Sequence, residues 1–194
     1  MEELGFRVSC QAPGEHIVTF VNEIQPANAA DLDPDPSNNT ATVEVTIECV
    51  IPVAINIKPG SFPNSINPRN QGVIPIAVLT TLAGEYDLPL DFDATMIDPL
   101  SVRFGLRDEV WGENGGAFEA HERGHIEDSY ELDEATRDGD EDMVLHFETQ
   151  ETGIGVDTTE ACAKGEWSDG GHTYKFFGCD SVRIPPGGDK PDKK

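Results

Sequence analysis

The sequence is poor in positive charge and in long apolar runs. It has 13 Lys and Arg residues against 37 Asp and Glu residues, which gives a formal net charge of −24. Nucleic acid is excluded as a partner, because its phosphates would be repelled over the whole surface. No apolar run approaches the roughly 18 residues that a membrane span needs. The first residues lack the basic and apolar segments of a signal peptide, so we expect an exported form to be a mature chain or a fragment.

Motifs for nucleophilic and phosphoryl chemistry are missing too. The chain has no Gly-x-Ser-x-Gly elbow, no phosphate loop and no candidate cysteine nucleophile. Paired carboxylates are abundant, but nothing singles out one pair for glycosidase chemistry. We therefore expect a protein that is not an enzyme.

Cysteine is scarce, and its four positions are far apart. With no Cys-x-x-Cys pair, the even number predicts two disulfides rather than a zinc site. Three pairings are possible, and the phase of the flanking strands favours Cys10–Cys49 and Cys162–Cys179. Cys10 lies on the same strand face as Val8, and Cys49 lies on the same strand face as Ile47. Both thiols would therefore point into one core. Disulfides need an oxidising compartment, which predicts an extracellular or cell-surface protein.

Glycine and proline are plentiful, with 19 and 14 residues. They are scattered, which is typical of many short strands joined by tight turns and predicts an all-β chain. Residues 1–52 form one predicted unit. Its three predicted strands are Phe6–Cys10, His16–Asn22 and Thr40–Cys49. The acidic segment Asp31–Asp35 between the last two is expected to be a solvated loop.

Residues 53–186 form a second predicted unit, a β-sandwich, and residues 187–194 a tail or linker. Pro75 lies in an apolar, central strand and predicts a bulge there. The seven predicted strands are Val53–Ile57, Val73–Leu79, Ser101–Phe104, Met143–Thr149, Thr159–Ala163, Thr173–Phe177 and Ser181–Ile184.

The first unit carries Pro13-Gly14-Glu15-His16 and Asp35-Pro36-Ser37-Asn38-Asn39-Thr40-Ala41 before a strand that ends in Cys49. It resembles the last strands of the Ig-like, cell-adhesion-related repeats of bacterial and archaeal surface proteins. Such repeats have about seven strands, and only about three fit here. The resemblance therefore implies a partial Ig-like β unit with an open edge. Either the second domain or a strand from a neighbouring chain would cover that edge.

The second unit resembles a calcium-binding β domain of unassigned function found in secreted bacterial and archaeal proteins. The resemblance covers most of residues 53–184 and implies the architecture and calcium binding, but no activity. The residues that carry it are Ile55–Ser61, Pro63–Asn67, Gly72–Leu79, Phe92–Thr95, Val102–Gly105, His125–Asp128, Asp138–Asp140 with Asp142, Leu145–Phe147 and Gly178–Arg183.

The acidic loop Asp138-Gly139-Asp140-Glu141-Asp142 is the candidate metal site. Carboxylates at alternate positions can curl around one Ca²⁺, which takes six to eight oxygens, and the glycine permits the sharp turn. Asp138, Asp140 and Asp142 are the predicted ligands. Residues 129–133 look inserted relative to the resembling domain, so the remaining ligand is Asp128, or Glu134 or Asp133 in its place.

His121-Glu122-Arg123-Gly124-His125 matches the His-Glu-x-x-His motif of zinc proteases. That motif needs a helix, whereas the alternation of the flanking residues predicts a strand. A strand would hold the two histidines roughly 13 Å apart, too far to share a zinc ion. The sequence also offers no obvious third ligand.

Three functions follow, of which the leading hypothesis is a non-catalytic extracellular structural or adhesive protein. It would be a building block of a cell-surface filament or other assembly, stabilised by calcium and disulfides and joined by strand complementation. Its partners would be copies of itself or neighbouring surface proteins. The alternative is a calcium-dependent module that binds polysaccharide. An exposed, coplanar arrangement of Trp111 or Trp167 would favour it, and burial of both would not. The third is a zinc metalloprotease.

Overall fold

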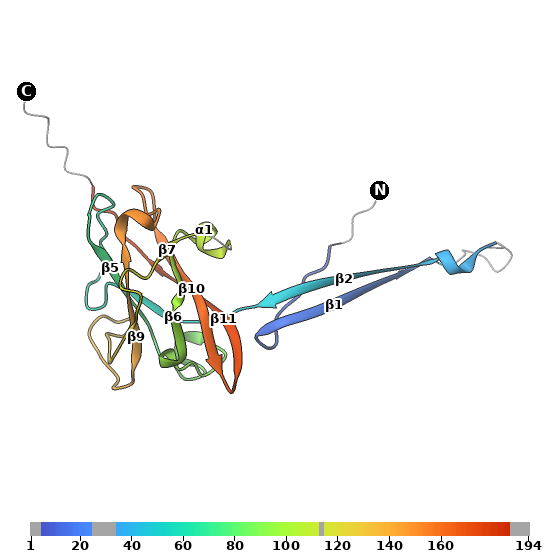
Figure 1. Cartoon of the computed structure of the whole chain (residues 1–194), viewed down its shortest axis with the longest axis horizontal. Helices are drawn as coiled ribbons and strands as arrows, with labels where there is room; N and C mark the ends of the chain where they lie inside the picture. The colour runs from blue at the N-terminus through green and yellow to red at the C-terminus, as the bar shows by residue number, and fades with distance from the viewer. Residues whose placement is uncertain (1–4, 25–33, 113–114, 187–194) are drawn as a thin grey trace, which may run out of the picture. The chain divides into compact units, whose positions relative to one another are not determined.

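A computed structural model describes residues 5–24, 34–112 and 115–186, and the chain divides into two compact units, Met1–Cys49 and Val50–Lys194. Figure 1 shows the elements of both units. The division falls slightly before the predicted boundary at residue 53. The reason is that Ile51 is buried and strand β3 (Ile51–Pro52) pairs with strand β11 of the second unit. The predicted tail 187–194 lies outside the described residues.

The first unit is a long hairpin of β1 (Gly14–Glu23) and β2 (Thr40–Cys49). The two strands are antiparallel and in register from Gly14 opposite Cys49 to Glu23 opposite Thr40. A short 3₁₀ turn, η1 (Pro36–Asn38), precedes β2, and the Asp35 carboxylate caps it by accepting a hydrogen bond from the Ser37 amide. Two of the three predicted strands are present. Asp31 and Asp33 of the predicted acidic loop lie outside the described residues.

The prediction of a strand at Phe6–Cys10 is wrong. The segment joins no sheet, and Phe6 packs its ring against Phe20 instead, with centroids 5.0 Å apart. The core into which the thiols of Cys10 and Cys49 are predicted to point is not formed in the described part of this unit, because Cys10 is exposed and Val43 and Val45 of β2 are 58% and 42% exposed. Both differences have one cause: within the described residues of this unit, no second sheet lies over the hairpin.

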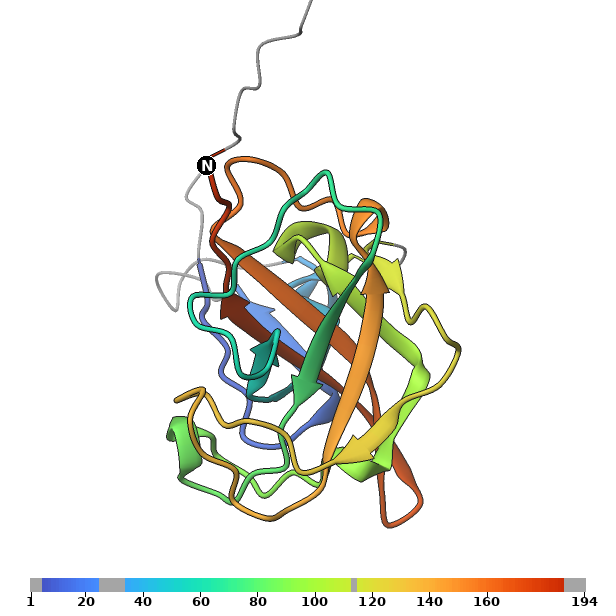
Figure 2. The ribbon, with the colours of Figure 1, turned by 90° about the vertical axis from the view of Figure 1, so that its left-hand side faces the viewer.

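The second unit is a β-sandwich of two sheets, as predicted. One sheet has the strand order β3-β11-β10-β6-β7 and the other β4-β5-β9-β8. Figure 2 shows β5 (green) and β9 (orange) side by side in front of the long β10–β11 pair. The strands are β4 (Ile55–Ile57), β5 (Val73–Val78), β6 (Ile97–Gly105), β7 (Ala117–Phe118), β8 (His125–Glu127), β9 (Asp142–Glu148), β10 (Glu160–Asp169) and β11 (His172–Ser181).

The core between the sheets follows from alternation along the strands. In β9, Met143, Leu145 and Phe147 point inward, whereas Asp142, Val144 and His146 lie on the opposite face of the same sheet. Aromatic rings fill the centre, and Phe104 of β6 packs on Phe147 at 5.2 Å between centroids. Val144 is also buried, in a smaller apolar cluster with Ala77 and Leu79. Both faces of β9 are therefore constrained.

Three strands are predicted near the C-terminal end, but the described residues there contain only two, β10 and β11. β10 and β11 are long partners across a two-residue turn at Gly170-Gly171, where both glycines have the positive φ that such a turn requires. Ser181 is the last residue of β11, so the separate strand predicted at Ser181–Ile184 is absent. Among the described residues that follow, 182–186, Arg183 forms an isolated bridge with Ser65.

The bulge predicted at Pro75 is absent, and β5 pairs with β9 in continuous register from Val73 to Val78. Pro75 lies opposite His146, whose amide and carbonyl both point away from β5, toward Glu119 and Ala120. The nitrogen of Pro75 points the other way, past the end of β4, while its carbonyl accepts from the Lys58 amide. The missing N–H therefore costs no bond to β9.

Both predicted disulfides are present, Cys10–Cys49 in the first unit and Cys162–Cys179 across β10 and β11. The helices are short: α1 (Arg107–Trp111) and the 3₁₀ turns η2 (Glu85–Asp87), η3 (Ala94–Met96) and η4 (Thr149–Glu151). No helix in the described part of the chain has the length and apolar character to cross a membrane.

Candidate metal sites

The acidic loop connects β8 to β9 and is the yellow-orange segment at the bottom of Figure 2. It closes on Asp142, the first residue of β9, which pairs with Glu127 of β8 and is fully buried. The Asp142 carboxylate accepts hydrogen bonds from the amides of Thr80 (2.8 Å) and Ser129 (2.9 Å). These bonds fix one carboxylate at the junction of the loop with the segment that follows β5.

Two further carboxylates converge on Asp142. Glu131 is only 8% exposed, and Asp140 is half-buried; one oxygen of each lies within 4.8 Å of the Asp142 carboxylate and of the other. Oε2 of Glu131 accepts a hydrogen bond from the Tyr86 hydroxyl. Oε1 of Glu131 and Oδ1 of Asp140 are buried with no hydrogen-bond partner. Glu131, Asp140 and Asp142 form what we call the acidic cluster.

The loop is held in place by the turn after β4. Asn56 is fully buried and donates through Nδ2 to the carbonyls of Tyr130 (2.8 Å) and Glu131 (3.1 Å). Gly60 has φ +79°, and a Cβ there would lie 3.0 Å from the Tyr130 ring. Asn and Gly at these positions of the Ile55–Ser61 segment therefore place the backbone that carries Glu131.

Burial and the crowding of carboxylates raise the pKa values of all three members of the acidic cluster. Burial, a hydrogen bond with Asp138 and repulsion from its neighbours raise the pKa of Asp140 to about 7. Burial also raises the pKa of Glu131 and, against two backbone hydrogen bonds, that of Asp142. Desolvated like charges favour uptake of positive charge, either protons or a cation.

The other predicted ligands lie around the cluster or away from it. Asp138 accepts from the Asp140 amide (3.1 Å), and Asp128 accepts from the Gly139 amide (3.4 Å), so both border the cluster. The Asp133 carboxylate accepts from the Thr136 amide (2.8 Å) and hydroxyl within its own turn. Glu134 accepts from the Gly60 amide (2.6 Å). The structure does not bring Asp133 or Glu134 into the group of three.

A second group of ligating side chains lies near the other end of the β8–β9 pair. His121, His125 and His146 each place one ring nitrogen within 4.8 Å of the others, and we call them the histidine cluster. Their ring centroids are 5.1 Å apart for His121 and His146, 5.7 Å for His125 and His146, and 6.5 Å for His121 and His125.

The predicted separation of roughly 13 Å between His121 and His125 is therefore wrong. Residues 121–124 form a turn, with Glu122 at φ 54°, and β8 begins only at His125. Buried Glu119 pins that turn, because its Oε2 accepts from the amides of His121 (2.6 Å) and Arg123 (3.0 Å). The helix that the protease motif needs is absent here, as expected.

Sequence reasoning missed Glu131, Glu119 and His146. Glu131 lies in the stretch that looks inserted. Its contacts with Asn56 and Tyr86, which the sequence does not reveal, position it beside Asp142. His146 carried a usable signal, because Met143, Leu145 and Phe147 alternate with Asp142, Val144 and His146. That pattern puts His146 on the same face as Asp142, opposite the core.

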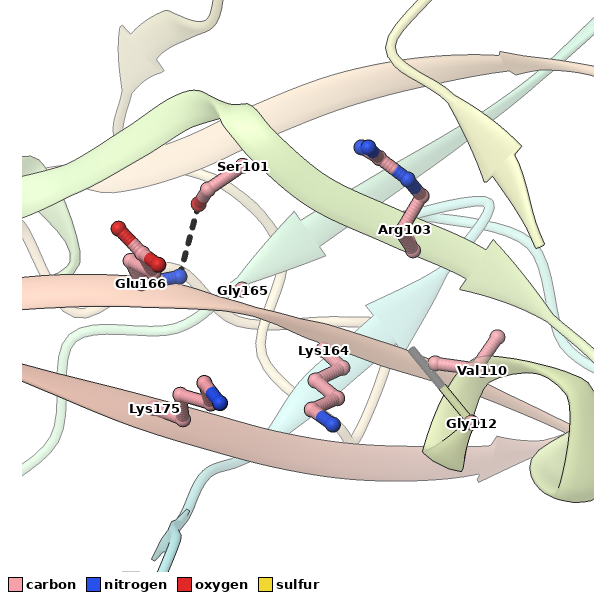
Figure 3. Close-up of a pocket in the computed structure, with 8 residues that line it drawn as sticks. All are labelled: Ser101, Arg103, Val110, Gly112, Lys164, Gly165, Glu166 and Lys175. Carbon is pink, nitrogen blue, oxygen red and sulfur yellow. Dashed lines mark hydrogen bonds between the residues drawn. The ribbon is translucent and has the colours of Figure 1, made fainter. Parts of the chain in front are cut away.

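A basic pocket of about 280 Å³ lies over β6, β10 and β11 (Figure 3). Arg103, Lys164 and Lys175 line it from these three strands, and the Glu166 amide donates to Ser101 Oγ at 2.7 Å. Trp111 is exposed near it, but its ring is perpendicular to Phe177. Trp167 is buried and stacks on Phe92. The coplanar exposed arrangement that would favour a carbohydrate-binding module is not formed.

Comparison of the chain with protein-family models, with curated proteins and with solved structures finds no match. The resemblance to a secreted calcium-binding β domain stays a prediction.

Proposed function

We propose that this chain is a non-catalytic structural or adhesive protein of the cell exterior whose sandwich is stabilised by a calcium ion in the acidic cluster. The supporting observation is the pair of buried, unpartnered carboxylate oxygens, Glu131 Oε1 and Asp140 Oδ1, beside buried Asp142. Buried charge needs a partner, and Ca²⁺ is a hard cation that takes carboxylate oxygens in flexible geometry. Asp138, Asp128 and water would complete its six to eight ligands.

The role proposed for the ion is mechanical. The β8–β9 loop supplies Glu131 and Asp140, while Asp142 begins β9 and is bonded to Thr80 after β5. A cation among them neutralises carboxylates that otherwise repel one another, and it binds the folded chain only. At 100 times its dissociation constant, such an ion adds about 2.7 kcal/mol to the free energy of unfolding.

Thermal unfolding with and without calcium tests this proposal. A gain of that size should raise the Tm by about 5–10 °C, and chelation with EDTA should remove the gain. Asp140→Asn should abolish the calcium-dependent shift, because it removes charge from the cluster. Asp133→Asn is the matched control, since its carboxylate is used within its own turn, and it should keep the shift. An unchanged Tm of the unaltered chain on adding calcium would overturn the proposal.

The extracellular part of the proposal is supported by the two disulfides, which persist in oxidising compartments. The assembly part is supported by the hairpin. In the described part of the first unit, β1 and β2 pair only with each other, and Val43 and Val45 are exposed. Such an edge is a template for a strand of a second copy of this chain. Light scattering over a range of concentrations tests it, and a monomer throughout would remove the assembly part alone.

A further inference from the structure

The histidine cluster is built by the register of β8 and β9. His125 lies opposite Val144, and His146 is two residues further along β9, so both imidazoles are on the face of the sheet away from the core. His121 begins the turn at 121–124, which follows the residues that pair with the end of β9, and its ring nitrogen lies within 4.8 Å of those of His125 and His146. The turn 121–124 and β8, which follow each other in the sequence, and the distant strand β9 thus bring three ring nitrogens to one place.

Glu119 holds two parts of this arrangement, the turn that carries His121 and the backbone of β9 at His146. It is 6% exposed and lies just after β7, where its Oε1 accepts from the His146 amide (3.2 Å) and its Oε2 from the His121 amide (2.6 Å). The same Oε1 lies 3.6 Å from His121 Nδ1. A carboxylate behind a metal-binding histidine is the usual means of orienting its ring. Glu119 is therefore both a backbone clamp and a positioning residue for His121.

One nitrogen of the histidine cluster is also left without a partner. His146 Nδ1 is buried with no hydrogen-bond partner. A buried polar atom without a partner is costly, and coordination to a metal ion would satisfy it. The cluster thus contains an unsatisfied buried nitrogen beside two further imidazoles.

We propose that His121, His125 and His146 bind one transition-metal ion, with zinc(II) as the best fit, at a site separate from the acidic cluster. Imidazole nitrogen suits zinc, whereas calcium takes oxygen ligands. Zinc–nitrogen bonds of about 2.0–2.1 Å place tetrahedral ligands about 3.3 Å apart. The present nitrogens lie within 4.8 Å of one another, so small side-chain rotations suffice. Three protein ligands leave the fourth position to water or to another small ligand, and the ion ties the 121–124 turn to β9.

Zinc titration of the full, metal-free chain against a chromophoric chelator tests the site. One ion should bind per chain, and excess calcium should not displace it. Loss of a residue that only hydrogen-bonds to a metal ligand typically weakens metal binding by about 10–100-fold. The double variant His121→Gln/His125→Gln removes two ligands, so its affinity for zinc should fall by at least that factor. The chain has five histidines, so His16→Gln/His172→Gln is a matched control that should bind as the unaltered chain does. Cobalt(II) bound in place of zinc should give the absorption of a tetrahedral nitrogen site.

Three results would overturn the proposal: equal zinc affinity in the two double variants, loss of zinc binding in Asp140→Asn, or displacement of zinc by calcium. The last two would assign the zinc to the acidic cluster. If His121→Gln/His125→Gln fails to fold, the imidazole NMR signals of the unaltered chain test the proposal instead. Zinc should shift the signals of the histidine cluster and leave those of His16 and His172 unchanged. The calcium-dependent Tm shift is measured on the zinc-free chain and tests the acidic cluster separately.

Discussion

The hairpin and the sandwich use apolar residues in opposite ways. In the sandwich, Ile76, Leu145 and Phe104 are fully buried between two sheets, whereas in the hairpin Ile17 is 68% exposed and Val21 is 64% exposed. Burial of apolar surface is the main favourable term in folding, and an isolated two-stranded hairpin is marginally stable in water. The sandwich therefore contains its own source of stability. The described residues of the hairpin have no such core, so we expect its stability to depend on its covalent crosslink.

The largest effect that tests this comparison is a cavity in the sandwich core. Phe104→Ala should lower the free energy of unfolding by about 3–5 kcal/mol, because the Phe104 ring is fully buried against Phe147. Urea unfolding followed by tryptophan fluorescence measures it. Both tryptophans, Trp111 and Trp167, lie in the sandwich, so this signal reports on that unit alone.

The matched control is Phe20→Ala, which removes the same ring from the hairpin. Phe20 is half-buried against Phe6, and its loss should leave the fluorescence transition of the sandwich in place. A shift of that transition as large as the one caused by Phe104→Ala would mean that the two units unfold together. The contrast between them would then be structural only.

The disulfides give the next largest effect. The Cys10–Cys49 and Cys162–Cys179 crosslinks span 39 and 17 residues, and each should contribute about 3–4 kcal/mol on the loop-entropy argument. Cys10→Ser/Cys49→Ser should remove amide-exchange protection from β1 and β2 and leave the fluorescence transition unchanged. Cys162→Ser/Cys179→Ser should shift that transition to lower urea and leave the hairpin protected. Retained protection in the first variant would show that the hairpin is stable without its crosslink.

Strand prediction from sequence succeeded where alternation agreed with tertiary burial. Thr40–Cys49 was predicted with its observed bounds, and the central apolar strand from Val73 matches β5 within one residue. Phe6–Cys10 failed because alternation alone does not supply a neighbouring strand, and hydrogen bonds to such a neighbour are what define a strand. Pro75 was misjudged because the direction in which a residue's N–H points depends on register, which the sequence does not contain.

The two candidate metal sites show the same difference between local pattern and long-range packing. Asp138, Asp140 and Asp142 are recognisable because a local motif with a glycine turn brings them together within five residues. Glu131 joins the acidic cluster because of its contacts with Asn56 and Tyr86. His146 joins the histidine cluster because β9 pairs with β8. Those contacts join segments far apart in the chain. A single sequence therefore predicts the local part of each site and leaves out the ligand that long-range packing supplies.

The smallest effect concerns charge on the surface of the sandwich. Arg107 donates to both carboxylate oxygens of Glu160, from Nε at 2.8 Å and from Nη2 at 3.1 Å, and the side chains are 54% and 43% exposed. The arginine holds the pKa of Glu160 below its usual range. A carboxyl whose pKa is lower in the folded state contributes stability above its unfolded pKa of about 4.3, and this contribution is lost as the pH falls.

Arg107→Gln should therefore lower the urea midpoint of the sandwich slightly at pH 7, by less than either change above, and by a smaller amount at pH 3. Exposed pairs are screened by solvent and salt, which keeps the effect small. Arg69→Gln removes the same charge elsewhere on the sandwich and corrects for net charge. An equal loss at both pH values would assign the stability to packing of Arg107 over the Phe177 ring, 5.5 Å away, rather than to charge. A loss as large as that of Phe104→Ala would mean that the sandwich, like the hairpin, depends on its surface, and the difference between the two units would disappear.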